Sequence, residues 1–118
     1  MTSLSVQKYN NLLIEISENR YQPEHGDPEL LDLSSLKIEN QYINHEQLLA
    51  LLEALSNNIT IIKLNFRCNK IGNEGAKAFA MNNTLRELDL WCNEVGDEGA
   101  KALAKNNRTC LKSFREIC

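Results

Sequence analysis

Hydrophobic and polar residues follow the same order twice in the centre of the chain. Residues 61–79 are IIKLNFRCNKIGNEGAKAF and residues 85–103 are LRELDLWCNEVGDEGAKAL, so the second copy lies 24 positions after the first. Large apolar residues at alternate positions open each copy, as in Leu88 and Leu90. Such alternation predicts a short strand with one face in the core and the other face open. Each copy is therefore expected to begin with a strand.

Capping residues mark where the helix of each repeat is expected to begin. Asn73 and Asp97 precede EGAKAFA and EGAKALA, and Asn44 precedes HEQLLALLEAL, with Gln47 three residues later. Side chains of these types accept the free backbone N–H groups of a first helical turn. We expect one helix over roughly residues 46–56 and two shorter ones after it. The small residues at the start of these two, Gly75 and Gly99 among them, are expected to let the helix approach the strand.

The repeat is expected to extend in both directions. With a shift of 28 positions, an earlier copy has Gln41 in place of the Asn, and a later copy starts at Leu111. In the earlier copy the residues aligned with Ile61, Leu64, Phe66 and Ile71 are Leu33, Leu36, Ile38 and Ile43. About three strand–turn–helix repeats are predicted.

Residues 1–29 do not match the repeat. Val6, Tyr9, Leu13 and Ile16 recur at helical spacing, which predicts an amphipathic helix over residues 3–18 that covers the open edge of the first repeat. The stretch NRYQPEHGDPE then reads as a loop. The predicted organisation is an N-terminal helical cap and loop over residues 1–29 and repeats over residues 30–118.

Composition limits the classes of partner. The 118 residues carry a net charge of −3, and 42% are hydrophobic. An excess of basic residues, typical of proteins that bind nucleic acid or anionic membranes, is absent. The N-terminal sequence MTSLSVQKYNNLLIEIS has no basic segment followed by an apolar run, so we expect no cleaved signal and a cytoplasmic location.

The four cysteines and two histidines show no pattern of a metal site or of a nucleophile. Cys68, Cys92, Cys110 and Cys118 are spaced by 24, 18 and 8 residues, with no CxxC pair. His25 and His45 lack other ligands at suitable spacing. We expect no metal, no cofactor and no enzymatic activity. Cys68 and Cys92 occupy equivalent positions and are expected to lie close together, as free thiols or, alternatively, as a disulfide.

The pattern LxxLxLxxNxI, seen at Leu85, Leu88, Leu90, Asn93 and Val95, resembles a leucine-rich repeat. The tail GDEGAKALA resembles the ribonuclease-inhibitor-like subtype, which occurs in ribonuclease inhibitors, nucleotide-binding immune receptors, activators of the Ran GTPase and effectors of intracellular bacteria. The resemblance covers about residues 30–114. It implies an α/β fold, a short solenoid with a parallel sheet. Asn69 and Asn93 are expected to form a buried ladder that holds the turns.

The open face of the strands is the expected functional surface. The outward residues of the two central repeats are Lys63, Asn65, Arg67, Glu87, Asp89 and Trp91, and those of the first repeat are Ser35, Lys37 and Glu39. Adjacent strands place Lys63 opposite Glu87, Asn65 opposite Asp89, and Arg67 opposite Trp91. One interpretation is a solvated surface with paired charges. The other is a binding surface centred on Trp91, since Trp beside Arg is enriched at binding hot spots.

Two classes of function remain open at this point. The first is a protein-binding module, such as an inhibitor or adaptor of an enzyme, or a bacterial effector acting in a host cytosol. The alternative is a GTPase-activating helper of the Ran-activator type. A homodimer through the C-terminal end is also predicted, because Phe114 continues the core pattern whereas Glu116 interrupts it. The competing expectation is a monomer whose last residues fold back as a cap.

Overall fold

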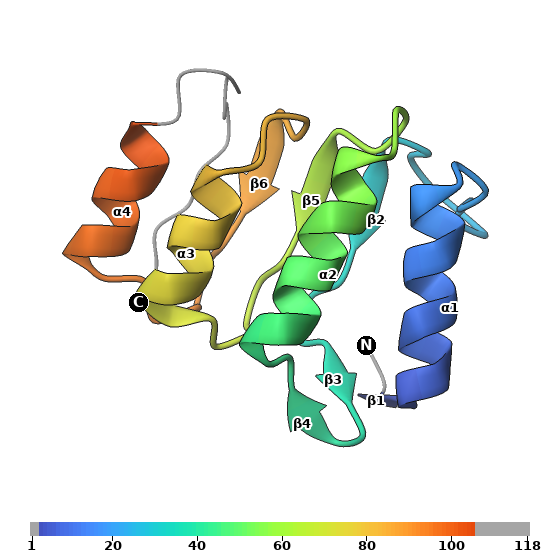
Figure 1. Ribbon diagram of the computed structural model, residues 1–118, viewed down its shortest axis with the longest axis horizontal. Helices are drawn as coiled ribbons and strands as arrows, with labels where there is room; N and C mark the ends of the chain where they lie inside the picture. The colour runs from blue at the N-terminus through green and yellow to red at the C-terminus, as the bar shows by residue number, and fades with distance from the viewer. Residues whose placement is uncertain (1–2, 106–118) are drawn as a thin grey trace.

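The computed structural model describes residues 3–105 and arranges them as a layer of helices against a layer of short strands (Figure 1). The helices are α1 (Val6–Ser17), α2 (His45–Ser56), α3 (Gly72–Ala80) and α4 (Asp97–Ala104). The strands are β1 (Ser3–Leu4), β2 (Leu30–Asp32), β3 (Lys37–Ile38), β4 (Gln41–Tyr42), β5 (Lys63–Asn65) and β6 (Glu87–Asp89). The mixture of helices and strands confirms the predicted α/β class.

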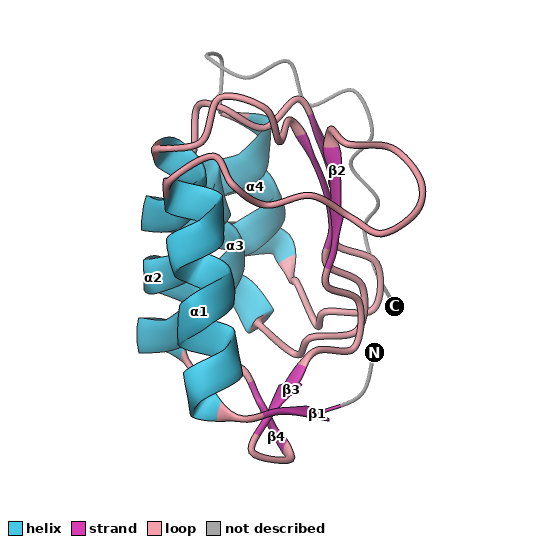
Figure 2. Ribbon diagram, turned by 90° about the vertical axis from the view of Figure 1, so that its right-hand side faces the viewer, coloured by secondary structure: helices cyan, strands magenta, loops and turns pink. Residues whose placement is uncertain are grey.

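Three strands form a parallel sheet on one side of the helices (Figure 2). The order is β2-β5-β6, with Leu31 paired with Leu64 and Leu64 with Leu88. These leucines share one buried core, as the alternating pattern predicted. Each of these strands is followed along the chain by a helix on the other layer, so the strand–turn–helix unit is confirmed.

The predicted alignment of the first repeat is wrong. Leu31 pairs with Leu64, so the first repeat lies 33 positions before the second rather than 28. The backbone N–H of Leu33 donates to the carbonyl of Asn65, which continues this register. Leu36 therefore occupies the place of the Asn. The outward residues of the first repeat are Leu30, Asp32 and Ser34, and not Ser35, Lys37 and Glu39.

A β-hairpin inserted between the first turn and α2 accounts for the longer first repeat. Strands β3 and β4 pair antiparallel, and Glu39 and Asn40 between them have φ angles of 51° and 63°. Strand β1 pairs parallel with β3. This second sheet of three strands is mixed, so the expectation of a purely parallel sheet holds only for β2-β5-β6.

Asn69 and Asn93 form the predicted buried ladder, and both have 0% exposure. The Asn69 side chain accepts from the N–H of Leu36 at 2.8 Å and donates to the carbonyl of Leu33 at 2.9 Å, both in the preceding repeat. Asn93 accepts from the N–H of Asn69 at 2.8 Å and donates to the carbonyl of Phe66 at 2.7 Å. Each amide thus connects its own turn to the repeat before it.

The capping residues of the helices match the prediction only in part. Asn44 and Gln47 form the predicted capping box of α2. Helix α3 begins one residue before Asn73, and α4 begins at Asp97 itself, so neither residue caps its own helix. Instead, the Asn73 side chain accepts from the N–H of Gly96 at 2.8 Å and of Gly99 at 3.0 Å, at the start of the next helix.

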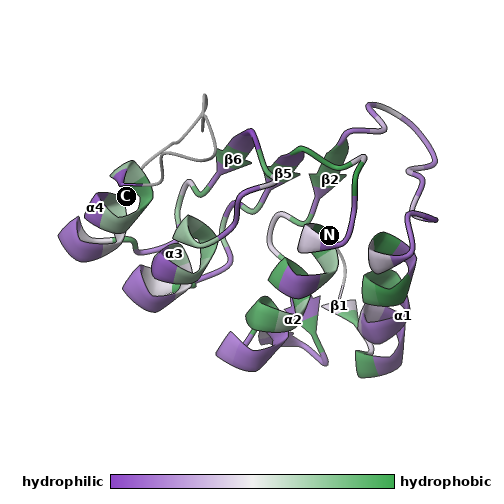
Figure 3. Cartoon of the chain, turned by 45° about the horizontal axis from the view of Figure 1, so that its top comes forward, coloured by the Kyte–Doolittle hydropathy of each residue, from purple (hydrophilic) through white to green (hydrophobic). Residues whose placement is uncertain are grey.

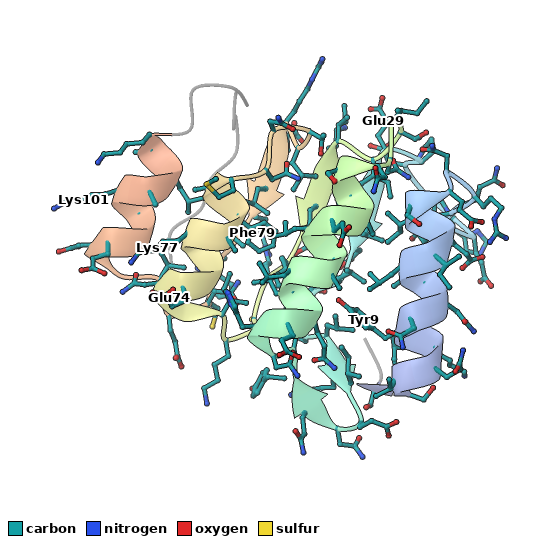
Figure 4. The ribbon with its side chains drawn as sticks, viewed as in Figure 1. Tyr9, Glu29, Glu74, Lys77, Phe79 and Lys101 are labelled. Atoms are coloured by element: carbon teal, nitrogen blue, oxygen red, sulfur yellow. The ribbon has the colours of Figure 1, made fainter. Side chains whose placement is uncertain are left out.

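Gly99 allows close packing, but against the preceding helix rather than against a strand. A Cβ atom at this position would lie 2.9 Å from both the Ala76 Cβ and the Asn73 Oδ1 atoms of α3. Real Cβ contacts are longer, so a side chain here would push α3 and α4 apart. The Lys77 Nζ atom of α3 also bridges the two helices, at 3.3 Å from Glu98 of α4. It lies 3.5 Å from Glu74 on its own helix (Figure 4).

The N-terminal helix α1 packs beside α2, at the end of the helical layer (Figure 1). Ser5 caps it by accepting from the N–H of Lys8. Tyr9 and Ile16 are buried as predicted, whereas Val6 is 44% exposed. Tyr9 points toward α2 and donates its hydroxyl hydrogen to the carbonyl of Gln47 at 2.8 Å (Figure 4). Burial raises the pKa of Tyr9 far above its usual range.

The core lies between the helical and strand layers. Helices α3 and α4 carry hydrophilic residues on the side that faces away from the strands (Figure 3). At the centre, Phe66 from the turn after β5 meets Phe79 of α3 edge to face, with ring centroids 5.3 Å apart. This contact joins the strand and the helix of one repeat.

The C-terminal predictions fall outside the described residues. They concern the repeat expected at Leu111, and with it Phe114, Glu116 and the homodimer. The homodimer therefore stays a prediction. The division of the chain at residue 29 lies within the described residues and also stays a prediction.

Asn69→Ala tests the ladder. We expect it to lower the free energy of unfolding by about 3 kcal/mol or more, because the buried N–H of Leu36 and carbonyl of Leu33 lose their partner. Urea denaturation followed by circular dichroism measures this change. The control is Asn11→Ala, at an exposed position of α1, which should change stability by less than about 0.5 kcal/mol. Equal stabilities of the two variants would contradict the role of the ladder.

Candidate functional site

The candidate site is the outer face of strands β5 and β6 with the residues that follow them. We call this surface the strand face, and it consists of Lys63, Asn65, Arg67, Glu87, Asp89 and Trp91. The register places Lys63 opposite Glu87 and Asn65 opposite Asp89, as predicted. Trp91 is 43% exposed, and the other five residues are partly buried. The side chains expected from the sequence are therefore brought together on one surface.

Arg67, Asp89 and Trp91 form a connected cluster on this face. The Arg67 Nε atom lies 2.5 Å from the Asp89 Oδ2 atom, in an ion pair that is partly shielded from solvent. The guanidinium carbon of Arg67 lies 5.7 Å from the centre of the Trp91 ring, within the range of a cation–π interaction. The Asp89 Oδ1 atom accepts from the backbone N–H of Trp91 at 3.0 Å. One carboxylate thus holds both the cation and the backbone of the aromatic residue.

The middle outward residue of each strand stabilises the turn that follows. Asp32, Asn65 and Asp89 each accept, through the Oδ1 atom, the backbone N–H two residues later, at 3.0, 3.2 and 3.0 Å. This is the Asx-turn, a local hydrogen bond typical of Asp and Asn. From the sequence, Asn65 and Asp89 were expected only as part of a binding surface. Their turn role was detectable in the two central repeats, where the two residues align, whereas Asp32 joins them only in the register that the structure has.

Lys63 pairs with a loop residue that the sequence analysis did not assign to the site. Its Nζ atom lies 3.0 Å from the Asp27 carboxylate and 3.9 Å from that of Glu29, both in the loop before β2. The hydrogen bond with Asp27 raises the pKa of Lys63. The pKa of Asp27 is lowered, first by the backbone N–H of Glu29 and then by Lys63. The loop therefore forms one border of the strand face.

Cys68 and Cys92 follow the strand face, in equivalent turns after β5 and β6. Both are free, partly buried thiols, as the sequence analysis favoured. Their backbones are left-handed, with φ angles of 58° and 62°, and Ser35 in the first repeat has the same conformation with φ of 50°. The Cys68 N–H donates to the carbonyl of Trp91 at 3.0 Å.

The helical side of the molecule has shallow cavities, and at the β3–β4 hairpin the Nζ atoms of Lys37 and Lys70 lie 3.9 and 5.3 Å from the centre of the Tyr42 ring. One cavity of about 270 Å³ lies between the N-terminal ends of α2 and α3, where Leu48, Lys70 and Ile71 are among the lining residues. Met81, at the end of α3, is 84% exposed. His45, which begins α2, is exposed, and so is His25 in the loop.

Residues 3–105 contain no group of three or more His, Cys, Asp or Glu side chains placed to hold a metal ion. Within the same range, no helix has both the length and the apolar character needed to cross a membrane.

A parallel sheet in which each strand is followed by a helix, with a buried Asn in each central turn, defines a repeat protein of the strand–turn–helix class. Residues 57–80 and 82–104 each match the family model described as Leucine Rich repeat. These two segments, 47 of the 118 residues, are therefore similar to leucine-rich repeats. Among curated proteins, no match to the chain is found. Leucine-rich repeats are generally protein–protein interaction modules, and repeat proteins bind through extended concave surfaces.

Asp27→Asn tests the ion pair at the border of the strand face. We expect the pKa of Lys63 to fall toward its ordinary value, because the partner that stabilises the charged ammonium is lost. An NMR titration of the lysine side chains measures this pKa. Glu24→Gln, a charge-neutralising change at an exposed position of the same loop, is the control and should leave the pKa of Lys63 nearly unchanged.

The same pair makes a pH-dependent contribution to stability. Folding lowers the pKa of Asp27. Its contribution to stability is therefore present at pH values above the ordinary pKa of Asp, and it is lost as the pH falls through the pKa of the folded protein. The contribution of Lys63, whose pKa is raised, is present below the ordinary Lys value and is lost as the pH rises through the folded pKa. An unchanged Lys63 pKa in Asp27→Asn would contradict this assignment.

Proposed function

We propose that this protein is a non-catalytic binding module that docks a partner protein on the strand face, with Trp91 as the central contact. One observation carries the proposal: a partly exposed Trp is held on the sheet by Arg67 and Asp89. Trp and Arg are the residue types most enriched among those that dominate binding energy. The leucine-rich repeats support the general class of function.

The cluster suits binding because it is ordered before a partner arrives. Asp89 fixes the Trp91 backbone, and Arg67 lies against the indole ring. Ordering a mobile side chain on association costs about 0.5–1.5 kcal/mol for each side chain, and a side chain that is already held loses less freedom. The Trp91 ring therefore presents a large apolar surface with a small entropic cost of binding.

The charges around Trp91 favour a partner without a strongly acidic contact surface. Both cations of the strand face, Lys63 and Arg67, already pair with carboxylates. Glu87 contributes a further negative charge beside Lys63, and Asp32 lies on the neighbouring strand β2. A partner that offers N–H donors or basic side chains would complement this pattern, and its association rate should then fall as salt concentration rises.

Inhibition or bridging of an enzyme is the role we infer within this class, and an effector acting in a host cytosol would use the same surface. The assignment to the ribonuclease-inhibitor-like subtype is part of this proposal and is supported by the helix that follows each strand of the parallel sheet. For the GTPase-activating alternative, the described residues offer no observation that favours it over simple docking. An assay of a captured enzyme, with and without this protein, distinguishes inhibition from bridging and from activation.

Trp91→Ala tests the proposed surface. Affinity capture with the wild-type protein identifies partners, and calorimetry with the purified partner then compares the variants. We expect Trp91→Ala to weaken binding by about 2 kcal/mol or more, which is over tenfold in affinity. Met81→Ala is the matched control, because it also truncates an exposed apolar side chain but lies at the end of α3 in the helical layer.

The two variants make the outcome decisive. Circular dichroism first establishes that both remain folded. Equal affinities for wild type and Trp91→Ala would remove the strand face as the docking surface. A selective loss with Met81→Ala would move the surface to the helical side.

A further inference from the structure

Two cysteines lie side by side in the turns that leave the parallel sheet. The register of β5 and β6 pairs Asn65 with Asp89, so the residues three positions later, Cys68 and Cys92, are also at matching positions. The hydrogen bond from the Cys68 N–H to the Trp91 carbonyl, 3.0 Å long, shows that the two turns remain adjacent there. The repeat itself therefore places the two thiols together.

The backbone geometry is compatible with a bond between the two sulfur atoms. Neighbouring strands are about 4.8 Å apart, inside the range of about 4.4–6.8 Å between the Cα atoms of disulfide-bonded residues. Both cysteines have the same left-handed backbone conformation, with φ of 58° and 62°. Matching backbones at adjacent positions direct the two Cβ atoms to the same side, and formation of the bond then requires these atoms to approach to about 3.5–4.5 Å.

The protonation of Cys68 is also linked electrostatically to Cys92. Burial raises the pKa of the Cys68 thiol, and hydrogen bonding with Cys92 raises it further. The Ser35 hydroxyl and the charge of Arg67 act in the opposite direction, toward the thiolate. Ser35, Cys68 and Cys92 thus form a short row across three repeats, in which a hydroxyl replaces the thiol in the first repeat. Within this row, a disulfide is possible only between Cys68 and Cys92.

We propose that Cys68 and Cys92 form a reversible intramolecular disulfide when a low-molecular-weight disulfide of the oxidised-glutathione type is present. One cysteine loses its proton and its thiolate attacks the oxidant, which forms a mixed disulfide and releases one small thiol. The thiolate of the other cysteine then attacks the protein sulfur of this mixed disulfide and releases the second small thiol. Two electrons pass from the protein to the oxidant, and excess reduced thiol reverses both steps.

The test is titration of the full chain with defined ratios of oxidised and reduced glutathione, followed by mass spectrometry. We expect the wild-type protein to lose the thiols of Cys68 and Cys92 together with two hydrogen atoms, with no glutathione retained at either of these two positions. After trypsin digestion without reduction, residues 68–70 should be found joined to residues 87–101, because cleavage sites follow Arg67, Lys70, Arg86 and Lys101. Trp91, the single tryptophan, precedes Cys92, so its fluorescence should fall as the bond forms.

Three variants separate this pair from other cysteine chemistry. In Cys68→Ser and in Cys92→Ser, the remaining cysteine should instead retain glutathione as a mixed disulfide. In Cys110→Ser/Cys118→Ser, which removes the two cysteines outside the described residues, the 68–92 bond should form at the same glutathione ratio as in wild type. Glutathione retained on Cys68 or Cys92 of the wild-type protein, or a bond of either residue with any other cysteine, would overturn the proposal.

Discussion

The stacking of the repeats depends on the buried amide of one Asn in each central turn. After β5 and β6, the chain leaves the sheet through residues with left-handed backbones, Cys68 and Cys92, and backbone polar groups beside these turns are buried. Unpaired buried N–H and C=O groups are costly. Asn69 and Asn93 satisfy them, and each does so partly in the preceding repeat. The apolar core alone would tolerate other spacings of the repeats, whereas these hydrogen bonds require one register.

Asn side chains also accept backbone N–H groups before each central strand and at the start of α4. Asn58 and Asn82 each accept two backbone N–H groups of the segment that leads into the next strand. Asn73 reaches from α3 to the first turn of α4, and so satisfies N–H groups of its neighbour rather than of its own helix. Local hydrogen bonds before each strand and a side chain that reaches the next helix therefore add to the contacts of the leucine core. Stability in such an array is a sum of contributions from each repeat and from its contacts with neighbours.

The two central repeats were predictable because each position was supported by its copy 24 residues away. The first repeat was not, because Leu33, Leu36 and Ile38 fit the hydrophobic pattern of the repeat at two alignments. At a shift of 28 positions Leu36 aligns with Leu64, and at the observed shift of 33 it aligns with Asn69. Leu in the place of this Asn is tolerated because the ladder Asn side chain bonds the preceding repeat, and Leu36 lies in the first one. The inserted hairpin kept the alternation of apolar residues, so the pattern did not reveal it. The Asp27–Lys63 pair was also unpredictable, since a loop residue reaches the sheet only through the folded path of the chain.

Comparison of the repeats with one another shows where the fold leaves freedom for recognition. The middle outward residue of each strand is Asp or Asn, and its side chain is required by the turn. Two positions later the three repeats have Ser34, Arg67 and Trp91, which share neither size nor charge. The fold therefore makes little demand on this last position. Arg67 and Trp91 nevertheless meet each other there, and the carboxylate that orders them is the same one that the turn requires. The proposed binding surface is thus supported by a residue that the architecture already needs.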